Sequence, residues 1–421
     1  MTQQYKYLHF IDYILFQRWD VKAYAFQQKV FKNAVLLREI LTPYNVPLSK
    51  EKMIDKGWSI IAKINFAGEL FLRAPENTKT FKGNVHEIDG ETLIYSKINV
   101  RHGCVYYHPK DSIPFGVSSE YPAYKIDNKR VNGDFLVLLL QSQYFKNALS
   151  AGTSGISKAR VKPNVFLDIQ IPLPSLEEQN KIIAVYRATI AQAKQYSTQA
   201  KDIDKQIEKY LNISLGIEES SVKKHESGKL YFMSSNQLTR WDVWNVSTNG
   251  YSKKYPLHYL HNVITMQSGK FLPSKAQKGG EYNVYGGNGL TGTHNEFCFT
   301  GKRIVIGRVG EYCGNVHLID GNYWITDNAL KVDKIADEVT WDFLAIALQA
   351  LNINQYRSIS AQPSISQTKI LQLQIPIPPL HTQNEIVEHI TRLRKKQKDL
   401  QQKSLTLRQQ VTQQFEQTIF N

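Results

Sequence analysis

Hydrophobic residues recur at alternating spacings of four and three positions in two long stretches of the chain. The first stretch begins at Ile182, and the second begins 204 positions later, at Ile386, in the same register. Lys, Gln, Asp and Arg fill the intervening positions, as is typical of the exposed face of a coiled-coil helix. Such a stripe could instead pack on a globular domain, but its polar outer face favours a helix pair. The residues expected in the core of that pair are Ile182, Tyr186, Ile203, Ile207, Ile386, Ile390, Leu393, Leu400, Leu407 and Val411.

A proline-rich block precedes each helical stretch, and the two blocks are close copies of one another. The first block, at residues 169–182, reads IQIPLPSLEEQNKI, and the second, at residues 373–386, reads LQIPIPPLHTQNEI. Proline has no N–H group, and the start of a helix has no partner for one, so each helix is expected to begin just after its prolines. The first helix is expected to end near Leu215 and Gly216, because glycine readily forms a left-handed helix cap.

The order of the segments predicts that the two helices run antiparallel. A globular segment precedes each helix, so if these segments sit at opposite ends, the second helix must return along the first. If the first hydrophobic position of one helix is paired with the last of the other, large residues mostly lie opposite large ones. Small residues then lie opposite small or polar ones. The resulting pairs are Tyr186 with Val411, Ala193 with Ser404, Ala200 with Gln397, and Ile207 with Ile390.

A second pair of matching motifs extends the repeat to the globular segments. The triplet Arg-Trp-Asp occurs at residues 18–20 and again at 240–242, and Val follows it both times. A linker rich in Glu, Ser, Lys and Gly separates the two halves. The predicted segments are globular domains at residues 1–171 and 231–375, helical segments at 172–216 and 376–421, and the linker at 217–230.

Short β-type runs between Gly and Asn turns indicate that both domains mix strands and helices. The expected strands are 93–95, 105–107, 304–306 and 315–318, and the expected buried helices are 135–145 and 341–351. The predicted fold class is therefore α/β. It consists of two globular mixed α/β domains separated by two long antiparallel coiled-coil helices, with a pseudo-two-fold internal repeat.

Charge and composition add an expected partner and compartment. The chain has 52 Lys and Arg residues against 37 Asp and Glu residues, and this net charge of +15 favours nucleic acid as a polyanionic partner. A basic protein without an anionic ligand is the alternative. The longest apolar run, residues 135–140, is far shorter than the roughly 20 residues that span a bilayer. The N-terminal stretch has no signal-peptide core, so we expect a cytoplasmic protein without a membrane partner.

Motifs for catalysis and cofactor binding are absent from the sequence. Its three cysteines are too few and too scattered for a disulfide framework or a zinc site. The Gly-x-Gly-x-x-Gly run at residues 287–292 precedes a β-like stretch instead of a helix, which favours a tight glycine loop over a dinucleotide site. There is no P-loop, no Asn-Pro-Pro or Asp-Pro-Pro triplet of amino-methyltransferases, and no Glu-x-Lys of metal-dependent nucleases. We expect a binding protein with no catalytic residue, no metal and no cofactor.

The proline-rich blocks, the long helices and the Arg-Trp-Asp openings together resemble the DNA-specificity subunits of type I restriction-modification systems. The resemblance covers essentially the whole chain, and residues 284–292 with 304–310 also look like a target-recognition domain of this family. The second block departs from the pattern at His381 and Thr382, where the first block has two glutamates. This change removes an acidic capping residue near the helix start.

The resemblance implies that residues 1–171 and 231–375 are target-recognition domains and that 172–216 and 376–421 are spacer helices. Each domain would read a few base pairs of double-stranded DNA, and the unequal halves suggest two different half-sites. The helices would dock two methylation subunits, which carry S-adenosylmethionine, and restriction subunits would complete an ATP-driven nuclease. The chain itself would bind DNA without catalysis. Two alternatives stay open: a non-catalytic scaffold with nonspecific DNA affinity, and a specificity subunit of a fused type II methylase-nuclease system.

Residues suited to reading DNA gather in loops of both domains. Arg and Lys suit guanine and phosphate, while Asn and Gln suit adenine edges. A solvated surface is the competing interpretation for the loops at residues 152–160 and 358–367. For Arg18 and Arg240, the adjacent Trp and Asp favour a structural ion pair over contact with DNA. The candidate contacts are Thr153, Ser154, Lys158, Arg160, Lys97, Arg101, Tyr285, Asn288, Gly289, Arg308, Arg357 and Gln362.

Overall fold

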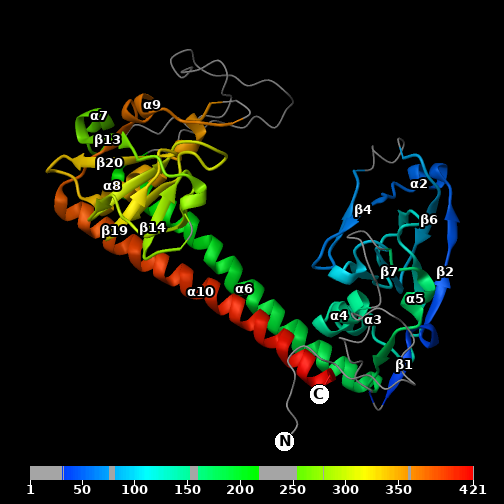
Figure 1. The fold of residues 1–421 in the computed structure, drawn as a ribbon. Coiled ribbons are helices and arrows are strands. Elements are labelled where there is room, and N and C mark those ends of the chain that lie inside the picture. Colours follow the sequence, from blue (N-terminus) through cyan, green and yellow to red (C-terminus); the bar gives the residue numbers. More distant parts are fainter. Residues whose placement is uncertain are drawn as a thin grey trace, which may run out of the picture. The chain divides into compact units, whose positions relative to one another are not determined.

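The computed structural model describes residues 31, 33–74, 81–151, 160–217, 254–277, 279–358 and 362–420. The chain forms two units, one of residues 1–195 with 403–421 and the other of residues 196–402. Two long helices, α6 (Leu176–Leu215) and α10 (Leu380–Phe420), each contribute one part to each unit (Figure 1). Both Arg-Trp-Asp triplets, and the predicted linker after its first residue, lie outside the described residues.

The main sheet of the first unit has four strands with antiparallel neighbours, in the order β2, β10, β7, β8. Its strands are β2 (Leu41–Tyr44), β10 (Ala123–Ile126), β7 (Thr92–Tyr95) and β8 (Val105–His108). Strands and helices share one core, in which Leu93, Phe135 and Phe166 are fully buried. The helices of this domain are η2 (Leu37–Glu39), η4 (Val100–His102), α3 (Gly133–Leu140), α4 (Gln143–Ala151) and α5 (Pro163–Leu167).

Smaller sheets extend the first domain around a second core that contains Met53, Ile60 and Phe115. A three-stranded antiparallel sheet is accompanied by a two-stranded hairpin and a short helix. These elements are β3 (Val46–Leu48), β6 (Val85–Ile88), β9 (Phe115–Val117), β4 (Ile61–Ile64), β5 (Leu70–Leu72) and α2 (Lys50–Asp55).

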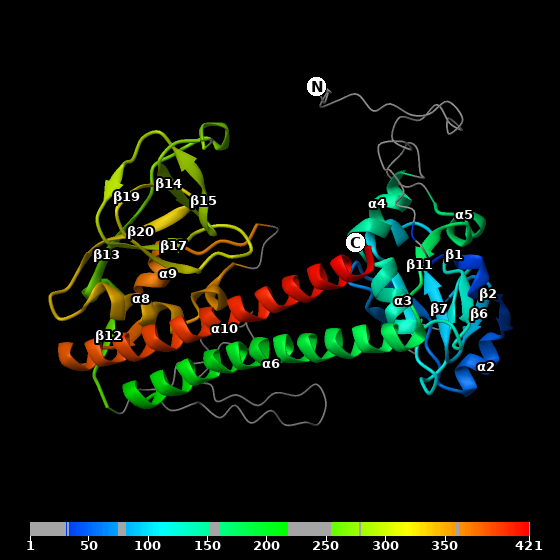
Figure 2. The ribbon, with the colours of Figure 1, turned by 90° about the horizontal axis from the view of Figure 1, so that it is seen from below.

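The second unit has the same four-stranded main sheet, in the order β13, β20, β17, β18. Its neighbours are again antiparallel. Figure 2 labels three of these strands, β13, β20 and β17. Buried residues of this sheet, of helix α8 and of the start of α10 form one core, including Ile304, Phe343 and Ile386. The elements are β13 (Ile264–Ser268), β20 (Ala329–Ile335), β17 (Arg303–Gly307), β18 (Val316–Ile319), α7 (Leu260–Val263), α8 (Trp341–Ala350), η7 (Ile353–Tyr356) and α9 (Gln367–Leu371).

The additional sheet of the second domain differs from that of the first. It has four strands in the order β15, β14, β19, β16, and β14 runs parallel to β19 while the other neighbours are antiparallel. The strands are β14 (Tyr282–Gly286), β15 (Gly289–His294), β16 (Phe299–Thr300) and β19 (Asn322–Ile325), and the short helix η6 (Ser274–Ala276) precedes them. The two domains thus share a main sheet and differ in what surrounds it.

A pair of short strands lies next to the start of each long helix. In the first unit β1 (Ala34–Leu36) pairs with β11 (Gln170–Pro172), and in the second β12 (Leu257–Tyr259) pairs with β21 (Gln374–Pro376). Both pairs are antiparallel and include the first proline of the repeated block. In each unit, the strand that leads into the long helix is therefore paired with a strand from the other side of the main sheet in the sequence.

A capping box starts helix α6. Ser175 N–H donates to Glu178 Oε2 at 2.9 Å, and Glu178 N–H donates to Ser175 Oγ at 3.3 Å, so two orphan donors of the helix start are satisfied. These hydrogen bonds lower the pKa of the exposed Glu178 carboxyl. Pro379 and Thr382 occupy the equivalent positions before and in α10, so the acidic half of the box is lost there.

Residues of α6 and α10 pair in the predicted antiparallel register within each unit. In the first unit, Ser404 Oγ donates a hydrogen bond to the Ala193 carbonyl at 2.7 Å. In the second unit, Gln397 Nε2 donates to the Ala200 carbonyl at 3.0 Å and to Asp204 Oδ1 at 2.7 Å. An advance of seven residues along α6 thus corresponds to a return of seven along α10. The antiparallel helix pair predicted from the sequence is confirmed.

The residues predicted to form the core of the helix pair, from the alternating spacing of four and three positions, are buried to different extents. Ala193 and Ala200, at the small positions of the stripe, are almost completely buried. The large predicted residues that are buried are Ile203, Ile386, Ile390, Leu400 and Val411. Those that are half-buried are Ile182, Tyr186, Ile207, Leu393 and Leu407.

Most predicted elements of the globular domains are present. Strands β7, β8 and β17 cover the predicted runs at 93–95, 105–107 and 304–306, and β18 covers the predicted run at 315–318 except for its first residue. Helix α8 covers the predicted helix at 341–351 except for its last residue. Helix α6 ends at Leu215, and Gly216 has a φ of +66°. The prediction of one helix over residues 135–145 is wrong, because α3 ends at Leu140 and α4 begins at Gln143. Ser142 Oγ accepts from the Phe145 N–H at 3.2 Å and caps a new helix there.

Helices long and apolar enough to cross a bilayer are missing from the part of the chain that the structure describes.

Candidate nucleic-acid interface

The loop before Arg160 carries three predicted contacts, Thr153, Ser154 and Lys158, which lie outside the described residues. Arg160 itself is exposed, and its Nε lies 3.3 Å from Glu120 Oε2. The Glu120 side chain is half-buried, and its Oε2 atom is shielded from solvent. The exposed Arg160 guanidinium also has donors of the kind that contact phosphates and base edges.

Lys97 follows strand β7 and is held by its backbone at the end of the main sheet. Its N–H donates to the Glu120 carbonyl at 3.1 Å, and its carbonyl accepts from the Val161 N–H at 2.8 Å. Because Arg160 pairs with Glu120, the two predicted contacts Lys97 and Arg160 lie close together. Arg101, four residues further on in η4, is half-buried.

Arg308 occupies the equivalent position in the second domain. Its N–H donates to the Asn328 carbonyl at 3.0 Å, and its carbonyl accepts from the Ile365 N–H at 2.9 Å. Val161 and Ile365 are 204 positions apart, which is the offset of the proline-rich blocks, so this is one hydrogen bond repeated in both domains. The exposed Arg308 guanidinium donates through Nη1 to Ser268 Oγ at 3.2 Å. Each domain thus places one cation at the same backbone site.

A hairpin turn lies next to Arg308. Strands β14 and β15 are joined at Gly287 and Asn288, and the Asn288 side chain is exposed. Asn315 Nδ2 donates to Asn288 Oδ1 at 3.3 Å. A Cβ on Gly307 would lie 2.0 Å from the Gly287 carbonyl oxygen, so only glycine permits this close approach. The turn is held against the end of strand β17, and the predicted glycine loop is confirmed.

Two predicted contacts in this hairpin, Gly289 and Tyr285, are packed inside the domain. Gly289 is buried with a φ of +83°, and an added Cβ would lie 2.9 Å from the His317 ring. Tyr285 lies in strand β14, half-buried, with its ring edge-on to Tyr323 at a centroid distance of 6.0 Å. Both residues support the turn that presents Asn288.

Arg357 and Gln362 flank the last loop of the second domain. Arg357 Nη1 donates to the Glu311 carbonyl at 3.2 Å. Gln362 is exposed, and the next residue, Pro363, accepts a hydrogen bond from the Gly310 N–H at 2.8 Å. Both predicted contacts therefore lie next to the loop that follows strand β17. Asn288, in the turn between β14 and β15, contacts the same loop through Asn315.

Sequence reasoning missed two residues of that loop. Tyr312 is 54% exposed, and an exposed aromatic ring can stack on a base. Asn315 bonds to the hairpin turn, and its amide is of the kind that reads base edges. A sequence signal was available, since both residues lie within seven positions of Arg308.

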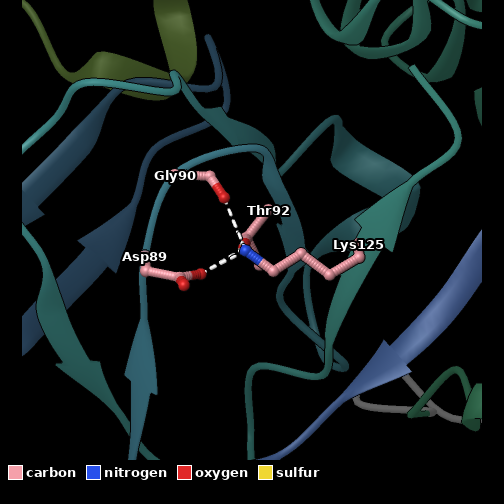
Figure 3. Close-up of polar contacts among 4 residues, drawn as sticks. All are labelled: Asp89, Gly90, Thr92 and Lys125. Atoms are coloured by element: carbon pink, nitrogen blue, oxygen red, sulfur yellow. Dashed lines mark hydrogen bonds and ion pairs between the residues drawn. The ribbon is translucent and has the colours of Figure 1, made fainter. Parts of the chain in front are cut away.

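Some cations of the first domain make internal contacts instead. Figure 3 shows Lys125, on strand β10, directed at the turn before strand β7. Its ammonium pairs with Asp89 and donates to the Gly90 carbonyl at 2.5 Å, and Thr92 Oγ1 donates to Asp89 Oδ1 at 3.2 Å. Burial raises the pKa of Asp89, but hydrogen bonds from Lys125, Tyr44 and Thr92 outweigh it and leave that pKa below its ordinary value. Lys125 is thus committed to holding the domain together.

The chemistry available in the described residues is that of cations, amides and hydroxyls. Among them, no group of three or more His, Cys, Asp or Glu is placed to hold a metal ion. Burial raises the pKa of the Cys104 thiol to about 11, and it also raises the pKa of Cys298 and Cys313. Thiols with a raised pKa are poor nucleophiles. This arrangement suits recognition of a polyanion.

Comparison with known proteins finds similarity in the second half of the chain. Residues 223–409 match the family model of the type I restriction modification DNA specificity domain. The specificity subunit of the type I restriction enzyme EcoprrI from Escherichia coli is 32% identical over 123 residues. That alignment covers 29% of this chain and 28% of the relative, so the match spans less than a third of the relative's length.

Two solved structures share the fold over nearly the whole chain. One comes from work on complex assembly and conformational transition of the type I R-M system; it has a TM-score of 0.58 and 16% identity, and covers 93% of this chain and 97% of that chain. The other is the S subunit of a type I restriction-modification system from M. genitalium, with a TM-score of 0.52, 15% identity, and coverage of 92% and 98%. Residues 223–409 are thus similar to the DNA specificity domain of type I restriction-modification systems, and the fold is similar to that of an S subunit of such a system.

Proposed function

We propose that this chain is the specificity subunit of a type I restriction-modification complex and reads an asymmetric, bipartite sequence in double-stranded DNA. Two methylation subunits dock on its helices, supply S-adenosylmethionine and transfer the methyl group. Restriction subunits add ATP-driven cleavage. The chain itself binds no cofactor, catalyses no step and determines which sequence the complex acts on.

The equivalence of Lys97 and Arg308 is the observation that carries this proposal. Both follow the same strand of the main sheet, and the carbonyl of each accepts the same repeated hydrogen bond. Arginine can bind the two acceptors of guanine or a phosphate in a bidentate manner, and lysine binds them as a point charge. One cation at the same site of each domain is what two readers of one duplex require.

The asymmetry of the target follows from the surroundings of these two cations. A hairpin turn and an exposed tyrosine accompany Arg308, whereas a second cation, Arg160, accompanies Lys97. The additional sheets also differ in strand number and order. Different groups meet different base edges, so the two half-sites have different sequences.

Exposed parts of the helix pair support the docking of partner subunits. In the first unit, α6 and α10 border a groove of about 230 Å³ that is lined by Tyr186, Val411 and Phe415, among others. Val185, on the rim of this groove, is 53% exposed. Apolar surface of this kind suits a protein partner.

Methylome sequencing tests the proposal in cells that carry this gene with its neighbours. The expected result is a bipartite methylated motif that disappears when the gene is deleted. Arg308→Ala should relax or weaken recognition of one half of the motif, and Lys97→Ala should affect the other half. Lys334→Ala, which removes an exposed cation from the far end of strand β20, is the matched control. A deletion that leaves every methylated motif in place would contradict the proposal.

A further inference from the structure

Two glutamines of the repeated proline-rich block have no exposed surface, although they lie among polar residues at the start of a helix. Gln179 is in the first turn of α6, and Gln383 is in the first turn of α10, 204 positions later. A buried amide must find hydrogen-bond partners, because leaving it without them costs free energy. The partners of these two amides connect each long helix to the domain that precedes it. We call each set of hydrogen bonds made by Gln179 or Gln383 a joint.

In the first unit, the Gln179 amide makes three hydrogen bonds, each of 2.9 Å. Its Oε1 accepts from the backbone N–H of Asn132, and its Nε2 donates to the carbonyls of Arg130 and Pro174. Asn132 is the N-cap of helix α3, and its own Oδ1 accepts from two N–H groups of that helix. One side chain therefore joins the start of α6 to the start of the domain helix.

The second unit repeats all three hydrogen bonds. Gln383 Oε1 accepts from the Thr340 N–H at 2.9 Å, and its Nε2 donates to the carbonyls of Glu338 at 2.7 Å and Pro378 at 2.9 Å. Thr340 is the N-cap of α8, as Asn132 is the N-cap of α3. The partners are backbone groups in every case, so the joint is preserved although the domain sequences differ.

Glutamine is suited to this joint by its chemistry and its length. Its amide offers an acceptor and two donors, which match one N–H and two carbonyls. An ionised glutamate cannot donate, and asparagine has the same amide on a side chain that is one methylene shorter.

Other polar contacts between domain and helix differ in the two units. In the first, Arg187 of α6 pairs with Asp134, and Asn132 Nδ2 donates to Asn180 Oδ1 at 2.8 Å. In the second, Arg394 of α10 donates to Gln349 Oε1 at 2.5 Å. The glutamine bonds are common to both units, whereas these contacts are particular to one.

We infer that Gln179 and Gln383 are positioning residues that fix each recognition domain on its spacer helix and thereby make binding sensitive to the distance between half-sites. This inference rests on the proposed function. A domain that rotates on its helix accepts half-sites at several spacings, whereas a domain held by three hydrogen bonds accepts few. The glutamines act through α3 and α8 and do not contact DNA.

The test uses the complete chain with Gln179→Met and Gln383→Met, which keep the length of the side chain and remove its hydrogen bonds. Gln206→Met, at an exposed position of α6, is the matched control. Once methylome sequencing has defined the motif, each protein is titrated at fixed salt with duplexes whose half-sites lie at the native spacing or one or two base pairs closer or further apart. Thermal unfolding of each protein is followed alongside.

Wild type and Gln206→Met should strongly prefer the native spacing, and the two joint variants should lose about tenfold of that preference while keeping their half-site sequences. An unchanged preference in a folded variant would overturn the inference, and so would an equal loss of affinity at every spacing. If the Met variants fail to fold, Gln→Asn at the same positions keeps the amide, shortens its reach and is judged by the same criteria. A wild-type chain that shows no bipartite preference contradicts the proposed function instead.

Discussion

Gly289 directly follows the hairpin turn of the second domain, and its backbone has a conformation that favours glycine. Its φ is +83°, and an added Cβ would lie 2.9 Å from the His317 ring. Gly289→Ala is expected to destabilise this domain by about 1–3 kcal/mol and to weaken binding to its half-site, because the turn presents Asn288. Thermal unfolding and DNA titration measure the two effects.

The loss of stability in Gly289→Ala has two expected sources, which are backbone strain and the contact with His317. Gly301→Ala separates them. Gly301 has a similar φ of +79°, but an added Cβ there meets no atom within 4 Å. It should therefore show the backbone strain without the contact with His317. Equal losses in the two variants would show that the contact is unimportant.

His317 should make the second domain sensitive to acid. Burial lowers its pKa below the ordinary 6.5. The unfolded chain then binds a proton at pH values where the folded domain does not, so the free energy of unfolding rises with pH from the lowered pKa up to about 6.5. Urea unfolding between about pH 5 and about pH 8 measures this slope.

Replacement of the imidazole tests this assignment. His317→Gln should reduce the slope, whereas His381→Gln, at an exposed position of α10, should leave it as in the wild type. A slope that is identical in all three proteins would assign the acid sensitivity to other groups.

At the scale of elements, the helix pair depends on small residues in its core. Ser404 Oγ donates to the Ala193 carbonyl at 2.7 Å, and Ala193 has no exposed surface. Ser404→Ala removes this hydrogen bond and should cost about 0.5–1.5 kcal/mol. Ser404→Leu forces extra volume against Ala193 and should cost about 1–3 kcal/mol. Circular dichroism during thermal unfolding measures both losses.

The adjacent exposed position provides the comparison for this substitution. Lys403→Leu introduces the same side chain on the outer face of α10 and should change stability little. A Ser404→Leu variant that is as stable as Lys403→Leu would show that the small core position is not required.

The register of this helix pair could be predicted because two independent patterns agree on it. The 4-3 stripe identifies the inward positions, and the repeat of the proline-rich block aligns the helices at an offset of 204. Ala193 opposite Ser404 and Ala200 opposite Gln397 follow directly. The local periodicity and the order of the segments in the chain thus predict the same antiparallel register.

The equivalence of the two candidate reading sites could not be predicted in this way. Lys97 and Arg308 are 211 positions apart, whereas the residues that bond to them, Val161 and Ile365, are 204 apart. Segments of different length lie between them, so no single offset aligns both. The burial of Gln179 was hidden for another reason, because its partners are backbone groups that a sequence does not distinguish.

At the scale of the whole molecule, α6 and α10 are shared by both units, and their length is expected to set the gap between half-sites. Deleting residues 197–203 and 394–400 removes opposing heptads and preserves the antiparallel register. Seven residues span about 10 Å at about 1.5 Å each, which corresponds to about three base pairs of DNA. The gap in the methylated motif, measured by methylome sequencing, should shorten by that amount.

A deletion confined to one helix is the control for this experiment. Removing residues 197–203 alone shifts every later pair, including Asp204 with Gln397, and should abolish recognition. An unchanged gap in the double deletion would mean that the helices do not set it.

The paired strands β1 with β11, and β12 with β21, have a consequence for inheritance. In each unit, a strand that precedes the main sheet pairs in fixed register with the strand that leads into the long helix, with Val35 opposite Ile171 in the first unit and His258 opposite Ile375 in the second. Genetic crossovers within the coding segments of both strands of a pair would replace the chain between them and leave the helix that follows, with its buried glutamine, unaltered. Under the proposed function, such an exchange would give two recombining genes new targets without intermediates in which only some of the DNA-contacting loops have changed.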